Sequence, residues 1–286
     1  MSLIKKTIDL ILYGNFWIAI GALALTLQTQ LILKGDFQLD NVSWFVFFAT
    51  FLLYALHRIV GILKLKDFLD LDRYSVINKF RRHIIYYAIF ASIGAIYFFF
   101  HLNWNVQLIL IIPAFLSLGY VFPFFGKKRR LRDFNQIKIY LIAGVWAFVT
   151  VFLPFLDSGQ ELNLAIIIMI LERGVFIFAI TLPFDIRDLN VDDYDNVKTI
   201  PAVIGIEKTK QLGYAIFGLC FALALTNHYL GLYDLKILIG LTISYLTSAW
   251  LVSFSSTGRH DYFYSALMDG TMILQFLIVM GAYFLF

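Results

Sequence analysis

Long apolar runs constrain the fold of this sequence more than any other feature. A helix needs roughly 20 mainly apolar residues to cross ~30 Å of hydrocarbon. Runs of that length cover residues 8–33, 42–63, 84–101, 105–124, 137–156, 163–184, 211–230, 235–254 and 262–285. Only 15% of the residues are charged, and the strand-length alternation of an outer-membrane barrel is absent. The sequence therefore predicts an all-α, polytopic membrane protein with nine transmembrane helices, in one domain over residues 1–286.

Basic residues lie mainly on one side of this topology. Of the 23 lysines and arginines, 20 fall on one side: those at the N-terminus, those in the loops after the second, fourth and sixth runs, and Arg58 and Arg259. Lys34 and Lys236 fall on the other side, and Arg173 lies inside a run. Because cytoplasmic loops retain Lys and Arg, we expect the N-terminus and these loops inside a bacterial cell membrane, with the C-terminus outside. The net charge of +4 does not suggest a nucleic-acid partner.

Carboxylates cluster where the sixth run ends, in "DIRDLNVDD". On a continuous helix Asp185, Asp188 and Asp192 would lie within a ~60° arc of one face. Carboxylates so close together require a cation, and oxygen ligands without nearby Cys or His suit Mg²⁺. A solvated acidic helix end is the alternative interpretation of the spacing. The basic loops on the same side favour a site that binds a polyphosphate.

The acidic stretch resembles the second aspartate motif of the UbiA-type intramembrane prenyltransferases. That motif is DxxDxxxD followed by a K/R-T-x-P turn and a Gly, and here Lys198, Thr199, Pro201 and Gly205 complete it. The segment "GYVFPFFGKKRRLRDF" is similar to a second family pattern. Its matching residues are Tyr120, Pro123, Lys128 and Arg129.

The resemblance implies nine helices around a central cavity within the membrane. It implies Asp185, Asp188 and Asp192 as the catalytic, metal-binding residues, with Mg²⁺ and a prenyl diphosphate bound beside them. The acceptor of the prenyl group would be lipophilic, an aromatic ring or quinone precursor. The residues expected at the diphosphate are His57, Arg58, Tyr120, Lys128, Arg129 and Lys198.

The first aspartate motif of that family is missing. From Asn41 to Lys66 there is no acidic residue, and Tyr54, His57 and Gly61 occupy the corresponding spacing. In one interpretation His57 and Arg58 hold the diphosphate directly, with a single metal site on the later aspartates. In another, the chain keeps the fold but has lost or changed the reaction. A third possibility is that the loop residues Asp67, Asp70 and Asp72 supply the missing ligands.

Three classes of function remain open at this point. The leading hypothesis is an enzyme, a prenyltransferase. The second is a protein that binds prenyl diphosphate or lipid without turnover. The third is a transporter, for which Glu172, Arg173 and Asp269 would form a polar path; we interpret these residues and Asn15 as structural.

Overall fold

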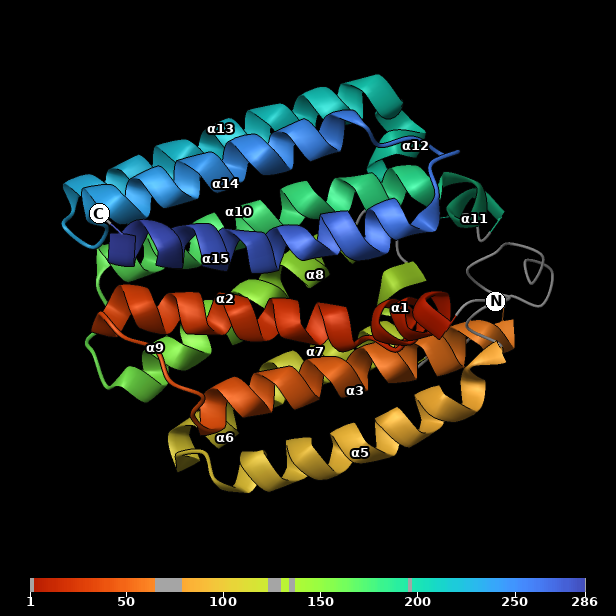
Figure 1. Cartoon of the computed structure of the whole chain (residues 1–286), viewed down its shortest axis with the longest axis horizontal. Helices are drawn as coiled ribbons and strands as arrows, with labels where there is room; N and C mark the ends of the chain where they lie inside the picture. The colour runs from red at the N-terminus through yellow and green to blue at the C-terminus, as the bar shows by residue number, and fades with distance from the viewer. Residues whose placement is uncertain (1–2, 65–78, 123–129, 134–136, 195–196, 286) are drawn as a thin grey trace.

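A computed structural model describes residues 3–64, 79–122, 130–133, 137–194 and 197–285. Every regular element in these ranges is helical, and most of the helices lie nearly side by side in one layered bundle (Figure 1). The elements are α1 Leu3–Tyr13, α2 Phe16–Lys34, α3 Asn41–Lys64, α5 Arg81–Phe100, α6 Trp104–Ile109, α7 Ile111–Val121, η3 Leu131–Asp133, α8 Ile137–Ala147, η4 Phe148–Phe152, α9 Leu153–Ser158, α10 Leu164–Arg187, α11 Leu189–Tyr194, α12 Ile200–Ile204, α13 Ile206–Tyr229, α14 Leu235–Ser253, η5 Phe263–Met268 and α15 Asp269–Leu285.

Nine helical segments of the described residues are long and apolar enough to cross a membrane. Six are single helices: α2, most of α3, α5, α10, α13 and α14. The other three are composite: α6 with α7, α8 with η4 and α9, and η5 with α15. The prediction of an all-α, multi-pass membrane protein is confirmed.

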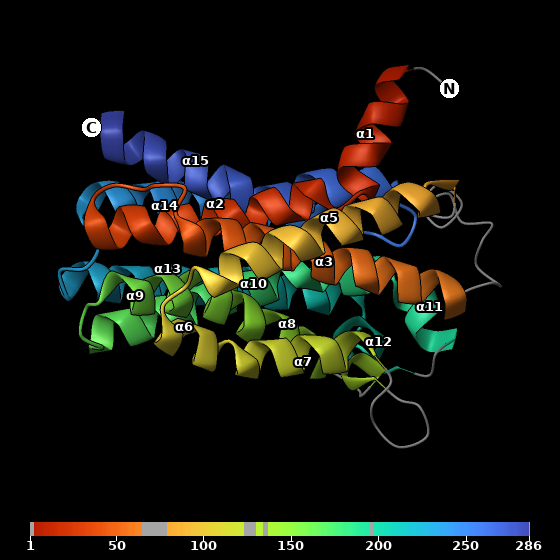
Figure 2. The same cartoon turned by 90° about the horizontal axis from the view of Figure 1, so that it is seen from below.

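The first predicted span, 8–33, is wrong at its beginning. Residues Leu3–Tyr13 form the separate helix α1, which projects steeply from the bundle, and the span itself begins at Phe16 (Figure 2). Between them Asn15 has a left-handed backbone, with φ 69°. Asn tolerates this conformation better than most residues because its short polar side chain bonds locally. The apolar run is therefore divided into two helices by a turn that hydrophobicity alone does not reveal.

The spans close around a central space. Helix α2 packs between α3 and α15, and α10 packs between α8 and α13; α7 joins α3 to α8, and α14 joins α13 to α15. Two close approaches depend on glycine. A Cβ on Gly94 would lie 2.5 Å from the Phe48 ring, and one on Gly240 would lie 2.9 Å from the Val279 backbone. Small residues at such points let membrane helices approach closely. Close packing matters here because the hydrophobic effect does not drive helices together within lipid.

Candidate active site

A cavity of about 290 Å³ opens inside this ring of helices. Its deeper wall is apolar and aromatic, and its residues include Leu53, Tyr54, Leu116, Ile142, Trp146, Ile177 and Met272. Its other end is charged and is formed where α3, α7, α8 and α10 begin or end. The charged lining residues are Arg58, Arg130, Arg132, Lys138, Asp185, Arg187, Asp188, Asp192, Asp261 and Asp269. The cavity therefore suits an amphipathic occupant with an apolar body and an ionic head.

Helix α10 ends before it has presented all three predicted aspartates. It contains Pro183, which donates no backbone hydrogen bond, and it stops at Arg187. Asp188 caps it with φ −87° and ψ 6°, and the short helix α11 follows. The expectation of a single helical face for Asp185, Asp188 and Asp192 is therefore wrong, because the chain changes direction between the second aspartate and the third.

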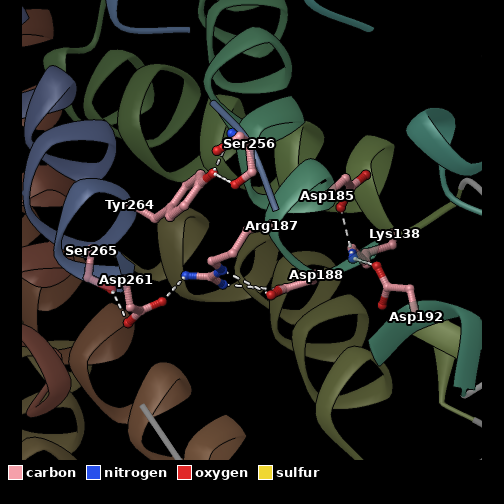
Figure 3. Close-up of polar contacts among 9 residues, drawn as sticks. All are labelled: Lys138, Asp185, Arg187, Asp188, Asp192, Ser256, Asp261, Tyr264 and Ser265. Carbon is pink, nitrogen blue, oxygen red and sulfur yellow. Dashed lines mark hydrogen bonds and ion pairs between the residues drawn. The ribbon is translucent and has the colours of Figure 1, made fainter. Parts of the chain in front are cut away.

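Lys138, in the first turn of α8, lies between two of the three aspartates (Figure 3). Its Nζ is 2.8 Å from a carboxylate oxygen of Asp185 and 3.0 Å from one of Asp192. All three residues are buried, with residue exposures of 7% or less. Burial raises the pKa of Asp192, and the Lys138 ammonium opposes that shift. One ammonium thus compensates two carboxylates from different helices.

Asp188 points away from Lys138 and binds a different cation (Figure 3). The Arg187 guanidinium donates two hydrogen bonds to it, at 2.9 and 3.0 Å, and a third to Asp261 at 2.9 Å. Ser265 donates to the second oxygen of Asp261 at 3.2 Å. The Arg187 guanidinium also lies 5.1 and 5.3 Å from the ring centres of Phe184 and Tyr264. This chain of contacts ties the end of α10 to the beginning of the last span.

The end of α3 contributes His57 and Arg58 to the same cavity. The His57 Nε2 lies within hydrogen-bond reach of the Arg132 guanidinium, which sits 5.6 Å from the ring centre of Tyr120. Arg58 donates through Nε to Asn15 and lies 5.6 Å from the Tyr13 ring. Where the missing motif would place carboxylates, the structure places an imidazole and a guanidinium.

Solved structures with the same architecture include UbiA homologues. A UbiA homologue from Archaeoglobus fulgidus bound to GPP and Mg²⁺ superposes with a TM-score of 0.66 at 13% identity, covering 97% of this chain and 99% of that one. An apo UbiA homologue from Aeropyrum pernix K1 has a TM-score of 0.65 at 12% identity, covering 99% and 98%. Digeranylgeranylglyceryl phosphate synthase has a TM-score of 0.58 at 17% identity, covering 99% of both chains.

The chain has the UbiA fold. The resemblance of the sequence motifs is thereby confirmed at the level of architecture, and the chain is an integral, multi-pass membrane protein. No protein-family profile and no curated protein matches the sequence.

On the UbiA fold, most of the predicted site residues meet at one end of the cavity. His57, Arg58, Tyr120 and the three aspartates of α10 and α11 all line it. Lys198 is exposed and is not among the lining residues. Several predicted residues lie outside the described residues: Asp67, Asp70, Asp72, Pro123, Lys128 and Arg129.

Lys138, Arg187 and Asp261 are charged cavity residues that sequence reasoning missed as part of the site. Lys138 was counted with the basic loop before the fifth span, and Arg187 lies inside the aspartate motif itself. A signal was available for Lys138, because a lysine placed just within an apolar run requires a buried partner. Arg130 and Arg132 belong to the basic loop segment that was expected to reach a polyphosphate, and both line the cavity.

The described residues do not form the Mg²⁺ site that the UbiA fold implies. Nowhere in the described part of the chain do three His, Cys, Asp or Glu side chains converge as metal ligands would. The donor chemistry of Asp185, Asp188 and Asp192 suits Mg²⁺. Their oxygens, however, face the Lys138 ammonium and the Arg187 guanidinium. The arrangement therefore does not fit a metal-binding role for these three carboxylates.

The remaining buried charges have internal partners. Glu172 accepts hydrogen bonds from the hydroxyls of Tyr233 and Tyr245. Arg173 donates to the Leu25 carbonyl at 3.2 Å. Neither residue lines the cavity, whereas Asp269 does. Glu172 and Arg173 thus connect helices, which does not favour the polar path of a transporter.

Proposed function

We propose that this chain is a membrane-embedded prenyltransferase that moves a prenyl group from a prenyl diphosphate to a lipophilic acceptor, an aromatic or quinone-precursor compound. The observation that carries the proposal is the two-ended cavity, with aromatic and aliphatic walls inside and arginines at one end. The UbiA fold supports it, since a homologue of that fold is bound to GPP.

The residues of the cavity have chemistry that suits this reaction. Arg58, Arg130 and Arg132 line the charged end, and guanidinium groups bind phosphate oxygens in a bidentate manner. When the bond between the prenyl carbon and oxygen breaks, pyrophosphate leaves with the electron pair. The acceptor then supplies an electron pair to the allylic cation and loses a proton. The rings of Tyr54, Tyr120 and Trp146 line the cavity where that cation would lie, and aromatic faces attract cations.

A second candidate is a protein that binds prenyl diphosphate without turnover. The pairing of Asp185, Asp188 and Asp192 with Lys138 and Arg187 favours it, because these carboxylates are already compensated. Binding of prenyl diphosphate and release of pyrophosphate can be measured separately on the same samples. Together the two measurements distinguish the candidates.

The test uses purified protein in detergent with radiolabelled geranyl diphosphate and longer prenyl diphosphates. We expect geranyl diphosphate to bind saturably and pyrophosphate to compete with it. Geraniol, which lacks the diphosphate, should bind more weakly than geranyl diphosphate. With a lipophilic acceptor fraction present, pyrophosphate release supports the transferase; binding without release supports the second candidate.

Matched variants locate the binding site. Arg132→Gln should weaken binding by about tenfold, the effect of losing one charged hydrogen-bonding group. Arg82→Gln, at the exposed beginning of α5, should leave binding unchanged. Equal binding of geraniol and geranyl diphosphate, or equal effects of the two variants, would contradict the proposed site.

A further inference from the structure

The buried ammonium of Lys138 occupies the space between two carboxylates that would otherwise face a cation. Its Nζ donates a hydrogen bond to Asp192 at 3.0 Å and forms an ion pair with an oxygen of Asp185 at 2.8 Å, without hydrogen-bond geometry. Carboxylates brought together around a central point are also the arrangement in which proteins hold divalent ions. A lysine and a metal ion cannot fill the same position.

The burial of Lys138 keeps its ammonium group between the two carboxylates. It belongs to the first turn of α8, and its side chain is 8% exposed, so its ammonium has little access to water. A divalent ion entering between Asp185 and Asp192 would leave this ammonium buried without its carboxylates. Charges buried without a partner are strongly unfavourable, so the lysine excludes the ion.

Among the residues that the structure describes, the other carboxylates near this point do not offer a substitute. Asp188 is held by two hydrogen bonds from Arg187, which also binds Asp261. At the facing end of α3 the lining residues are His57, Arg58 and Gly61, none of which is a carboxylate. The acidic side chains at this end of the cavity are therefore paired with lysine and arginine side chains of the same chain.

We propose that Lys138 is a built-in counter-ion that replaces a divalent metal between Asp185 and Asp192. Resting on the proposed function, the inference is that a prenyl diphosphate binds here without a divalent ion. Its negative charge is met by guanidinium groups that line the same end of the cavity, Arg58, Arg130 and Arg132.

Direct metal binding tests the proposal, with Mn²⁺ as the probe and electron paramagnetic resonance of the free ion as the readout. The wild-type protein should bind no Mn²⁺ at these carboxylates. Lys138→Gln, which removes the charge, should gain one Mn²⁺ per chain, and the added change Asp185→Asn should abolish that gain. Lys210→Gln is the matched control, because Lys210 pairs with the single surface carboxylate Glu207 at 2.9 Å; it should gain none.

The wild-type protein provides a second measurement, which remains informative if Lys138→Gln does not fold. Geranyl diphosphate should bind with the same affinity, within about twofold, in Mg²⁺ and in EDTA. One Mn²⁺ bound per wild-type chain and lost in Asp185→Asn, or affinity that falls about tenfold in EDTA, would overturn the proposal. Absence of geranyl diphosphate binding in both solutions would instead overturn the proposed function, while the Mn²⁺ measurements still decide the role of Lys138.

Discussion

Asn15 combines two roles in one residue. Its backbone adopts the left-handed conformation that separates α1 from α2, and its side chain accepts a hydrogen bond from Arg58. Arg58 lines the charged end of the cavity. The orientation of a site residue on α3 thus depends on a turn 43 residues earlier in the chain.

Two substitutions separate these roles. Asn15→Gly keeps the left-handed backbone and removes the acceptor, so we expect near-wild-type stability and weaker binding of geranyl diphosphate. Asn15→Ala removes both, and we expect an additional loss of stability of about 1–2 kcal/mol. Thermal unfolding can be followed with a thiol-reactive dye, because the single cysteine, Cys220, is fully buried. Equal stability of the two variants would show that the backbone conformation is not the constraint.

Residue identities predicted the location of the site better than its contacts. The aspartates, His57, Arg58 and Tyr120 were placed in the cavity by motif and spacing, and the structure brings them together there. The pairing of Lys138 with Asp185 and Asp192 was not predictable in the same way. It depends on how α8 and α10 face each other and on the turn at Asp188, which a helical projection of the sequence does not contain.

At the scale of helices, α1 lies outside the nine spans, and one of its contacts joins it to the segment before the last span. The Tyr262 hydroxyl, just before the last span, donates to the Asp9 carboxylate. Burial and the neighbouring Asp9 raise the pKa of Tyr262 to about 12, so this donor keeps its proton at neutral pH. The folded-state pKa exceeds the ordinary value of 10.0, so its stabilising contribution is complete below pH 10 and is lost as the pH rises toward 12.

Removing that hydroxyl should loosen α1 alone. In Tyr262→Phe we expect faster hydrogen–deuterium exchange in residues 3–13 and unchanged exchange in α2, because the bundle itself does not rely on this contact. Tyr229→Phe, at a side chain that is 81% exposed, is the control and should change neither helix. Faster exchange throughout the bundle would mean that α1 stabilises the whole fold.

Hydrophobic periodicity and run length predicted the spans because each helix must satisfy its backbone internally in lipid. The break at Asn15 was not predicted because the apolar run continues on both sides of it. Similarly, α10 ends at Arg187 through local backbone geometry at Asp188, whereas the apolar run had already ended at Phe184.

For the whole molecule, the two termini lie at opposite ends of the bundle (Figure 1). With the basic loops inside, we expect the N-terminus and the charged end of the cavity in the cytoplasm and the C-terminus outside. Fusions at the C-terminus in a bacterial host check this. Alkaline phosphatase should be active there and green fluorescent protein should not fluoresce. The reverse pattern would invert the orientation and place the site on the outer face.

The contacts of Glu172 and Arg173 limit how far the cavity extends along α10. By helical rise Glu172 lies about 20 Å from Asp185 along α10, and the α10 wall of the cavity begins only at Ile177. In that part of the bundle, Glu172 accepts a hydrogen bond from Tyr245 of α14 and Arg173 donates one to the Leu25 carbonyl of α2. On the proposed function, a hydrocarbon tail longer than the cavity would therefore extend between the helices into the lipid. The head group would then enter and leave at the charged end of the cavity.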